Sequence, residues 1–166
     1  MIDKMNSSAN PSSVLNEENW SDETCENPGI PRLLGFLQLC ADRRFHKVLQ
    51  ERFQKDAGLM SPEDYWIHAD AGGTPKMECQ RTAPDYVYYT EKVRLMGWSA
   101  HGSGCGGFGK DVPDDVIRKA LVAVAQRKAA EYDEADHFIY FATIVKEGDV
   151  ETAHIYSLKE RRAPRS

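Results

Sequence analysis

Leu33–Cys40 reads Leu-Leu-Gly-Phe-Leu-Gln-Leu-Cys, an almost wholly apolar run that ends in a cysteine. Such a run predicts a strand buried on both faces of a parallel sheet. Apolar side chains then recur at helical spacing from Arg44 to Ala57, and Gly58 follows where a helix commonly ends. The order of strand, short turn and helix indicates that the folded body opens with an α/β unit.

The next part of the chain continues this alternation. Residues 64–69 predict a second strand, and a proline at the start of 84–92 favours a helix over that range. Residues 93–100 predict a third strand. The spacing of apolar residues also permits a single helix up to Gly97, which would leave only 98–100 as strand.

A glycine-rich loop and a long helix follow the third strand. The loop covers 101–110, and the acidic run 111–115 is typical of a helix start because carboxylates are favourable near the positive end of the helix dipole. This helix should extend to Tyr132. Its expected buried residues are Val116, Ile117, Ala120, Leu121, Val124 and Ala125. Residues 137–145 and 150–158 then predict two strands joined by a hairpin-type connection.

Length and charge limit the classes of protein. The chain has 166 residues, 41% of them hydrophobic, which suits one domain with its own core. We expect no transmembrane segment, since no apolar run approaches the roughly 18 residues that one needs. Residues 1–30 hold six acidic residues and one basic residue, which accounts for the net charge of -5. The balanced remainder lacks the basic excess of a nucleic-acid binder.

These compositional differences predict three segments. We expect an acidic leader over 1–30, an α/β domain over 31–158 and a basic tail over 159–166. The four cysteines stand at positions 25, 40, 79 and 105. The first residues contain no apolar signal sequence, so we expect a cytoplasmic protein with reduced thiols. Cysteines in such a protein serve as metal ligands, as catalytic groups or as small buried residues.

Two of the cysteines stand with a histidine at the ends of predicted strands. Cys40 ends the first strand, and His101 and Cys105 follow the third. Because the carboxyl ends of parallel strands meet at one edge of a sheet, these side chains should converge if the two strands are neighbours. Two thiolates and an imidazole can hold zinc and leave its fourth tetrahedral position free, as in catalytic zinc sites. Water in that position would supply hydroxide as a nucleophile.

Asp42 and Arg44 follow Cys40 directly and form a candidate catalytic dyad. A guanidinium can bind a carboxylate through two hydrogen bonds, which keeps the carboxylate ionised and oriented. Asp42 would then accept a hydrogen bond from the water on zinc and orient it. If Asp42 instead bound the zinc, it would close the site. Taken alone, the two residues could equally be an ordinary ion pair or a helix cap.

The pattern C-x-D-x-R after an apolar strand resembles the β-carbonic anhydrase family. The resemblance extends to a second strand that ends in 71–73, Ala-Gly-Gly, and to a histidine and a cysteine before Gly106-Gly107. It covers roughly 33–107. The family usually has two residues between that histidine and cysteine, whereas this chain has three, Gly102, Ser103 and Gly104. The two glycines would let the loop bulge enough to restore ligation.

The resemblance implies a fold and an activity. The fold is a mainly parallel four-stranded α/β sheet flanked by helices, with an added C-terminal edge strand or hairpin. The activity is hydration of carbon dioxide to bicarbonate by hydroxide on one zinc ion per chain. Cys40, His101 and Cys105 are the implied metal ligands, and Asp42 and Arg44 the implied catalytic dyad. The family also implies a homodimer or higher even oligomer whose leader arm embraces the other subunit.

Other functions fit parts of the same pattern. The chain could be a non-catalytic zinc-binding protein, or a metal-free regulatory protein with the same fold. It could hydrolyse another small linear substrate, such as carbon disulfide, through the same hydroxide. If the chain were instead an α/β enzyme unrelated to zinc, the sulfurs of Cys40 and Cys105 would lie too far apart to share a metal.

Among the other histidines, we expect His46 to be solvated, and His137 and His154 to lie on edge strands.

Overall fold

The computed structural model describes residues 19–27, 29, 32–76 and 82–162. By its contacts the chain divides into two units, Met1–Ile30 and Pro31–Ser166. The described residues of the first unit are all exposed. Cys79 lies outside the described residues. No helix in the described ranges is long and apolar enough to cross a membrane.

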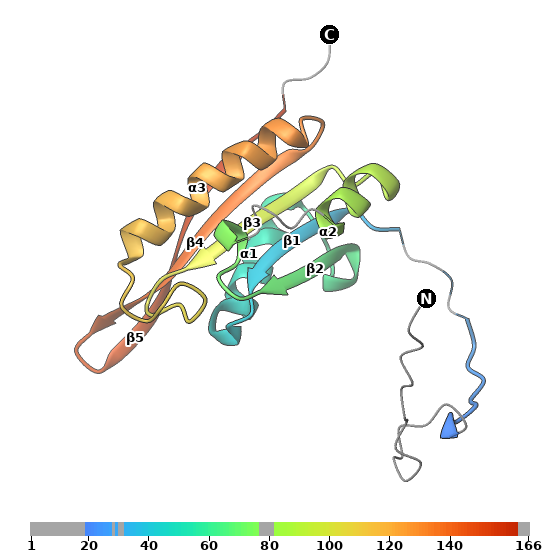
Figure 1. Ribbon diagram of the computed structural model, residues 1–166, viewed down its shortest axis with the longest axis horizontal. Helices are drawn as coiled ribbons and strands as arrows, with labels where there is room; N and C mark the ends of the chain where they lie inside the picture. Colours follow the sequence, from blue (N-terminus) through green and yellow to red (C-terminus); the bar gives the residue numbers. More distant parts are fainter. Residues whose placement is uncertain (1–18, 28, 30–31, 77–81, 163–166) are drawn as a thin grey trace, which may run out of the picture. The chain divides into compact units, whose positions relative to one another are not determined.

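The second unit is built on a five-stranded sheet (Figure 1). The strands are β1 (Gly35–Cys40), β2 (Tyr65–Asp70), β3 (Leu95–His101), β4 (Asp136–Glu147) and β5 (Val150–Glu160). Their order is β2-β1-β3-β4-β5. The first four in the chain are parallel, and β5 runs antiparallel to β4 along the edge. The predicted fold class, a parallel four-stranded α/β sheet with an added edge strand, is confirmed.

Within the described ranges, three α-helices accompany the sheet. A 3-10 turn, Arg43–Phe45, leads into α1 (His46–Ala57). The short helix α2 (Thr82–Asp85) continues as a π-helix over Tyr86–Thr90, and the long helix α3 spans Asp114–Glu131. A separate helix and third strand therefore form as predicted. The alternative of one helix up to residue 97 is wrong.

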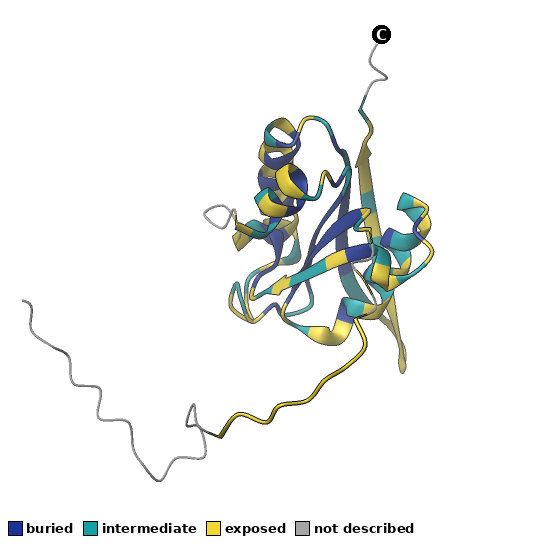
Figure 2. Cartoon of the chain, turned by 90° about the vertical axis from the view of Figure 1, so that its right-hand side faces the viewer, coloured by how far each residue is buried: buried dark blue, intermediate teal, exposed yellow. Residues whose placement is uncertain are grey.

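Both faces of the central strands β1 and β3 are buried, as expected for parallel strands. Along β1, Phe36 and Cys40 belong to the cluster that includes Leu121 of α3, whereas Leu37 and Leu39 belong to the cluster beneath α1. This alternation follows from the two-residue period of a strand. Figure 2 shows the buried residues concentrated in the central strands and on the inner sides of the helices. The rigid core thereby fixes the carboxyl ends of β1 and β3.

Sequence-based expectations about burial are wrong at Val116 and His137, and Ala120 is only half-buried. Val116 is 48% exposed, because the buried side of α3 begins at Ile117 and returns at Leu121, at helical spacing. His137 is only 2% exposed, since β5 pairs with β4 and moves His137 away from the edge of the sheet. His154 lies exposed on the edge strand β5, as expected.

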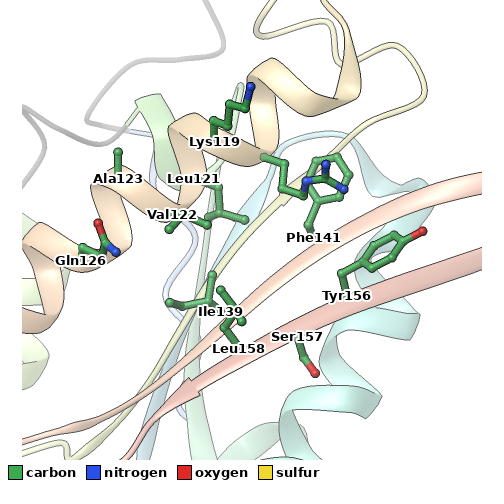
Figure 3. Close-up of a pocket in the computed structure, with 11 residues that line it drawn as sticks. Lys119, Leu121, Val122, Ala123, Gln126, Ile139, Phe141, Tyr156, Ser157 and Leu158 are labelled. Atoms are coloured by element: carbon green, nitrogen blue, oxygen red, sulfur yellow. The ribbon is translucent and has the colours of Figure 1, made fainter.

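A groove runs between α3 and the edge strand β5, where no helix covers the sheet (Figure 3). Its volume is about 630 Å³. Much of its lining is apolar and includes Leu121, Val122, Ile139, Phe141, Tyr156 and Leu158. None of the residues predicted to carry chemistry lines it. Cys40 and His101 lie instead at the carboxyl ends of β1 and β3.

Candidate metal centre

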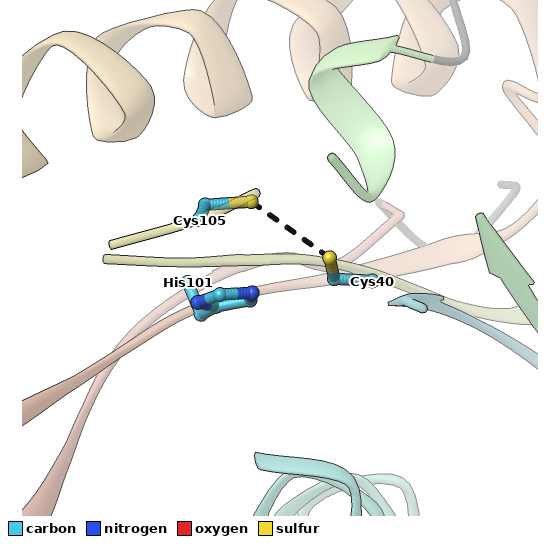
Figure 4. A group of neighbouring side chains, drawn as sticks. All are labelled: Cys40, His101 and Cys105. Atoms are coloured by element: carbon cyan, nitrogen blue, oxygen red, sulfur yellow. Dashed lines mark hydrogen bonds between the residues drawn. The ribbon is translucent and has the colours of Figure 1, made fainter. Parts of the chain in front are cut away.

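The three predicted ligands meet at one point of the sheet. Cys40 is the last residue of β1 and His101 the last residue of β3, and these strands are parallel neighbours. The loop after β3 brings Cys105 back to the same place. The two Sγ atoms lie 3.8 Å apart, and all three ligand atoms lie within 4.8 Å of one another (Figure 4). The wide separation of the sulfurs that an α/β enzyme unrelated to zinc would entail is not observed.

The cluster is deeply buried. Cys40 is 5% exposed, and His101 and Cys105 are each 1% exposed. No other group of three such His, Cys, Asp or Glu donors occurs within the described part of the chain. Buried polar groups normally have hydrogen-bond partners, so a polar atom of this cluster that lacks one is unusual.

The ring of His101 presents one nitrogen to the sulfurs. Its Nδ1 lies 2.8 Å from the carbonyl oxygen of Gly102. Because a carbonyl can only accept, Nδ1 carries the hydrogen in the neutral ring and Nε2 carries the lone pair. Nε2 is buried and has no hydrogen-bond partner. Phe45 stacks on the ring at 4.9 Å between centroids. A backbone carbonyl on one nitrogen and a bare second nitrogen is the arrangement of a metal-ligating histidine.

The surroundings favour a thiolate at Cys40. Burial raises the pKa of the Cys40 thiol, but the adjacent His101 and the backbone N–H groups of Asp42 and Gly72 outweigh burial and lower that pKa to about 7. Burial, together with the nearby Cys40 sulfur, raises the pKa of Cys105. Metal ligation requires deprotonated sulfur, so the Cys40 thiol loses its proton to a metal more readily than the Cys105 thiol does.

Burial also lowers the pKa of His101, but contact with Cys40 and Gly102 and the charges of Cys40 and Asp42 raise it overall. A metal at this nitrogen would therefore compete with a proton.

Asp42 and Arg44 form a bidentate ion pair beside the cluster. Arg44 Nη2 donates to Asp42 Oδ2 at 2.7 Å, and Arg44 Nε lies 3.0 and 3.1 Å from the two carboxylate oxygens. The hydrogen bonds from Arg44 hold the pKa of Asp42 below its usual range. Asp42 Oδ2 lies 3.7 Å from His101 Nε2, and the Asp42 side chain is 26% exposed. The ionised carboxylate thus lies between the buried cluster and the surface.

The loop after β2 closes the other side of the cluster through backbone contacts. The N–H of Gly72 lies 3.4 Å from Cys40 Sγ. Gly73 has a φ of +62°, and a Cβ there would lie 2.6 Å from the carbonyl oxygen of Ser99. A Cβ on Gly107 would lie 2.1 Å from Gly72 N. The glycines of the two loops therefore allow their backbones to approach closely enough for the N–H to reach the sulfur.

His46 also takes part in this region, which the sequence reasoning missed. Its Nε2 lies 2.6 Å from the carbonyl oxygen of Cys40, and the residue is half-buried. The expectation that His46 is solvated is therefore wrong. The 3-10 turn between Cys40 and α1 returns the start of the helix to the end of the strand, and no helical periodicity reveals such a contact.

The donor set fits a zinc ion. Two thiolate sulfurs bound at about 2.3 Å and at a tetrahedral angle lie about 3.8 Å apart, and the observed separation is 3.8 Å. The third donor is an imidazole nitrogen with a free lone pair. Among the described residues the structure brings together three donors of this kind, which is the number that leaves one tetrahedral position open.

Fold and site together define an α/β protein with a candidate metal centre. No protein-family model matches the chain, and no curated protein matches it. Among solved structures it is similar to a chain from crystal structures of two tetrameric β-carbonic anhydrases from the filamentous ascomycete Sordaria macrospora. The identity is 15%, and the alignment covers 73% of this chain and 83% of that chain, with a TM-score of 0.40. This likeness assigns no role to any residue of the chain.

Proposed function

We propose that this protein is a zinc-dependent enzyme that hydrates carbon dioxide to bicarbonate. The observation that supports the proposal most strongly is the unpartnered Nε2 of His101, buried beside two sulfurs at a zinc-compatible separation. Leaving such a nitrogen without a partner costs about 1–3 kcal/mol. That cost is offset when the lone pair binds a metal.

In this proposal Cys40, His101 and Cys105 hold one zinc ion per chain. A zinc ion with an open position acts as a Lewis acid and lowers the pKa of water towards neutrality. Asp42 is ionised and can only accept hydrogen bonds, so it accepts one from the attacking water and orients the oxygen lone pair towards carbon dioxide. Arg44 holds Asp42 in place through the bidentate contact.

We also propose a homodimer or higher even oligomer as the active assembly. Trp66 on the edge strand β2 is 40% exposed, and its ring contacts that of Tyr86, which is 46% exposed. Exposed aromatic pairs are common where subunits meet. Light scattering at micromolar concentration should show a dimer or larger even assembly, and a monomer alone would refute this part of the proposal.

The test of the function combines metal analysis with a hydration assay. Freshly reduced protein should contain about one zinc per chain and should hydrate carbon dioxide in a stopped-flow assay. Cys40→Ser should lose both properties, because a serine hydroxyl does not replace a thiolate. Cys25→Ser is the matched control, since Cys25 is exposed and lies in the other unit, and it should change neither. Absence of both metal and hydration in the unaltered protein would overturn the proposal.

Two further outcomes separate the alternatives. Stoichiometric zinc without hydration would overturn the enzyme and favour a non-catalytic zinc-binding protein. Hydrolysis of carbon disulfide without hydration of carbon dioxide would show that the same centre acts on a different linear substrate, and it would overturn the choice of carbon dioxide.

A further inference from the structure

The three residues between His101 and Cys105 form a loop that is anchored to two other elements. The N–H of Ser103 donates to Asp114 Oδ1 at 2.9 Å. The hydroxyl of Ser103 lies 2.8 Å from that of Thr143 on β4, and it accepts the N–H of Ile144 at 2.8 Å. The N–H and the side chain of Ser103 are thus occupied by residues of α3 and β4.

Asp114 is the centre of these contacts. It is the first residue of α3, and its second oxygen, Oδ2, accepts the hydroxyl of Thr143 at 2.6 Å. A carboxylate at the start of a helix interacts favourably with the helix dipole. One side chain therefore joins the loop, the start of α3 and β4.

The carboxylate of Asp114 also lies directly against Gly102. A Cβ on Gly102 would lie 2.2 Å from Asp114 Cγ, so no side chain fits between them. Gly102 is the residue whose carbonyl accepts from His101 Nδ1, and its N–H donates to the carbonyl of Ala142 at 2.8 Å. The position of Asp114 thus fixes the peptide that orients the imidazole ring.

Arg44 holds the loop from the opposite side. Its Nη1 donates to the carbonyl of Ser103 at 3.1 Å, and its Nη2 donates to the carbonyl of Gly104 at 2.9 Å. Ser103 has a φ of +55°, a left-handed conformation that costs a non-glycine residue roughly 1–2 kcal/mol. Contacts on both sides maintain this conformation, and it turns the chain so that Cys105 returns to Cys40.

We propose that Asp114 is a positioning residue for the metal centre. It holds the lengthened loop in the one conformation that brings His101 Nε2 and Cys105 Sγ to Cys40. The inference rests on the proposed function only in that the cluster binds a metal, and it concerns the affinity and geometry of the site rather than the reaction. Asp114 itself touches none of the three donor atoms.

The test measures metal affinity and cobalt spectra in matched variants. Asp114→Ala should weaken zinc binding by about 10–100-fold in a chelator competition, as loss of supporting contacts around metal ligands does elsewhere. It should also reduce the cysteine-to-cobalt absorption, because Cys105 is no longer held near the metal. Asp114→Asn keeps one acceptor oxygen for the Ser103 N–H and should restore part of the affinity. Asp115→Asn is the control, since Asp115 is exposed and pairs only with Lys119 at 3.6 Å among its described contacts.

The outcomes separate the two proposals. Thermal unfolding of the metal-free chains shows whether each variant folds. If Asp114→Ala does not fold, the affinity and the cobalt spectrum are measured on Asp114→Asn. Wild-type affinity and an unchanged cobalt spectrum in a folded Asp114 variant would overturn the inference alone. Loss of affinity in that variant, with no hydration by the unaltered protein, would support the inference and overturn the enzymatic proposal. An unaltered protein that binds neither zinc nor cobalt would overturn both.

Discussion

His101 and His137 are two buried imidazoles at opposite ends of the same pair of parallel strands. His101 ends β3, and His137 is the second residue of β4. Both nitrogens of His137 have partners: Nδ1 accepts from Trp98 Nε1 at 2.9 Å, and Nε2 donates to the carbonyl of Tyr132 at 2.9 Å. His101 makes a hydrogen bond through Nδ1, whereas its Nε2 has no hydrogen-bond partner and lies 3.7 Å from Asp42 Oδ2.

This difference separates a structural histidine from a candidate ligand. Burial is nearly equal, 1% for His101 and 2% for His137, so exposure cannot distinguish them. An imidazole with both nitrogens in hydrogen bonds joins neighbouring groups and has no lone pair free to bind a metal. An imidazole with a bare lone pair beside two sulfurs carries an energetic cost that a metal would relieve.

The largest effect should come from His101→Asn. Asparagine can still donate to the carbonyl of Gly102 but cannot reach the position of Nε2. Zinc affinity should fall by at least about 100-fold in a chelator competition, since one of three protein ligands is lost. His154→Asn is the control, because His154 is exposed on β5, and it should bind zinc normally. Equal affinity in the His101 variant would contradict its assignment as a ligand.

Arg44→Lys should have a smaller effect and should act on the reaction more than on the metal. A lysine ammonium cannot donate at once to Asp42 and to two loop carbonyls. We expect the rate of carbon dioxide hydration to fall by about tenfold while zinc content stays near one per chain. Arg43→Lys, an exposed neighbour, is the control. A variant with full activity would remove Arg44 from the proposed dyad.

The smallest effect concerns stability and pH at His137. Burial lowers the pKa of His137, despite the opposing effects of the Tyr132 carbonyl and of Glu160 and Asp136. Below about pH 6.5 the unfolded chain therefore binds a proton that the native chain excludes, so stability falls as the pH falls. His137→Gln keeps a donor and an acceptor but does not titrate.

Urea unfolding between about pH 7.5 and 5 measures this contribution. The His137→Gln variant should lose less stability on acidification than the unaltered protein, and it should bind zinc normally. If the free energy of unfolding changed with pH equally in the two chains, His137 would not contribute to the pH dependence of stability. The sign of the expected change is opposite to that of a histidine which gains a proton on folding.

Much of the fold could be predicted because strong local signals agreed with the tertiary structure. The apolar run before Cys40 and the helical spacing of Ile117, Leu121 and Ala125 each specified one element and its buried side. Exposure of Val116 and burial of His137 were missed for a common reason. The precise face of a helix and the neighbour of a strand depend on packing, which short sequence patterns do not encode.

The residues that meet at the candidate site were also predictable, because parallel strands place their carboxyl ends together. Cys40, His101 and Cys105 were expected to converge on this ground, and they do. The supports were not predictable. Asp114 reads as an ordinary acidic helix start, and its contact with Ser103 depends on how close α3 comes to the loop. Their roles in metal binding and catalysis stay predictions.

The left-handed pair Ser103 and Gly104 has a consequence for how such chains are recognised. A turn of this kind reverses the backbone locally, so His101 and Cys105 lie together although three residues separate them. Distance along the chain is then a poor measure of distance in space. The positions of the two strand ends describe this site better than the number of residues between His101 and Cys105.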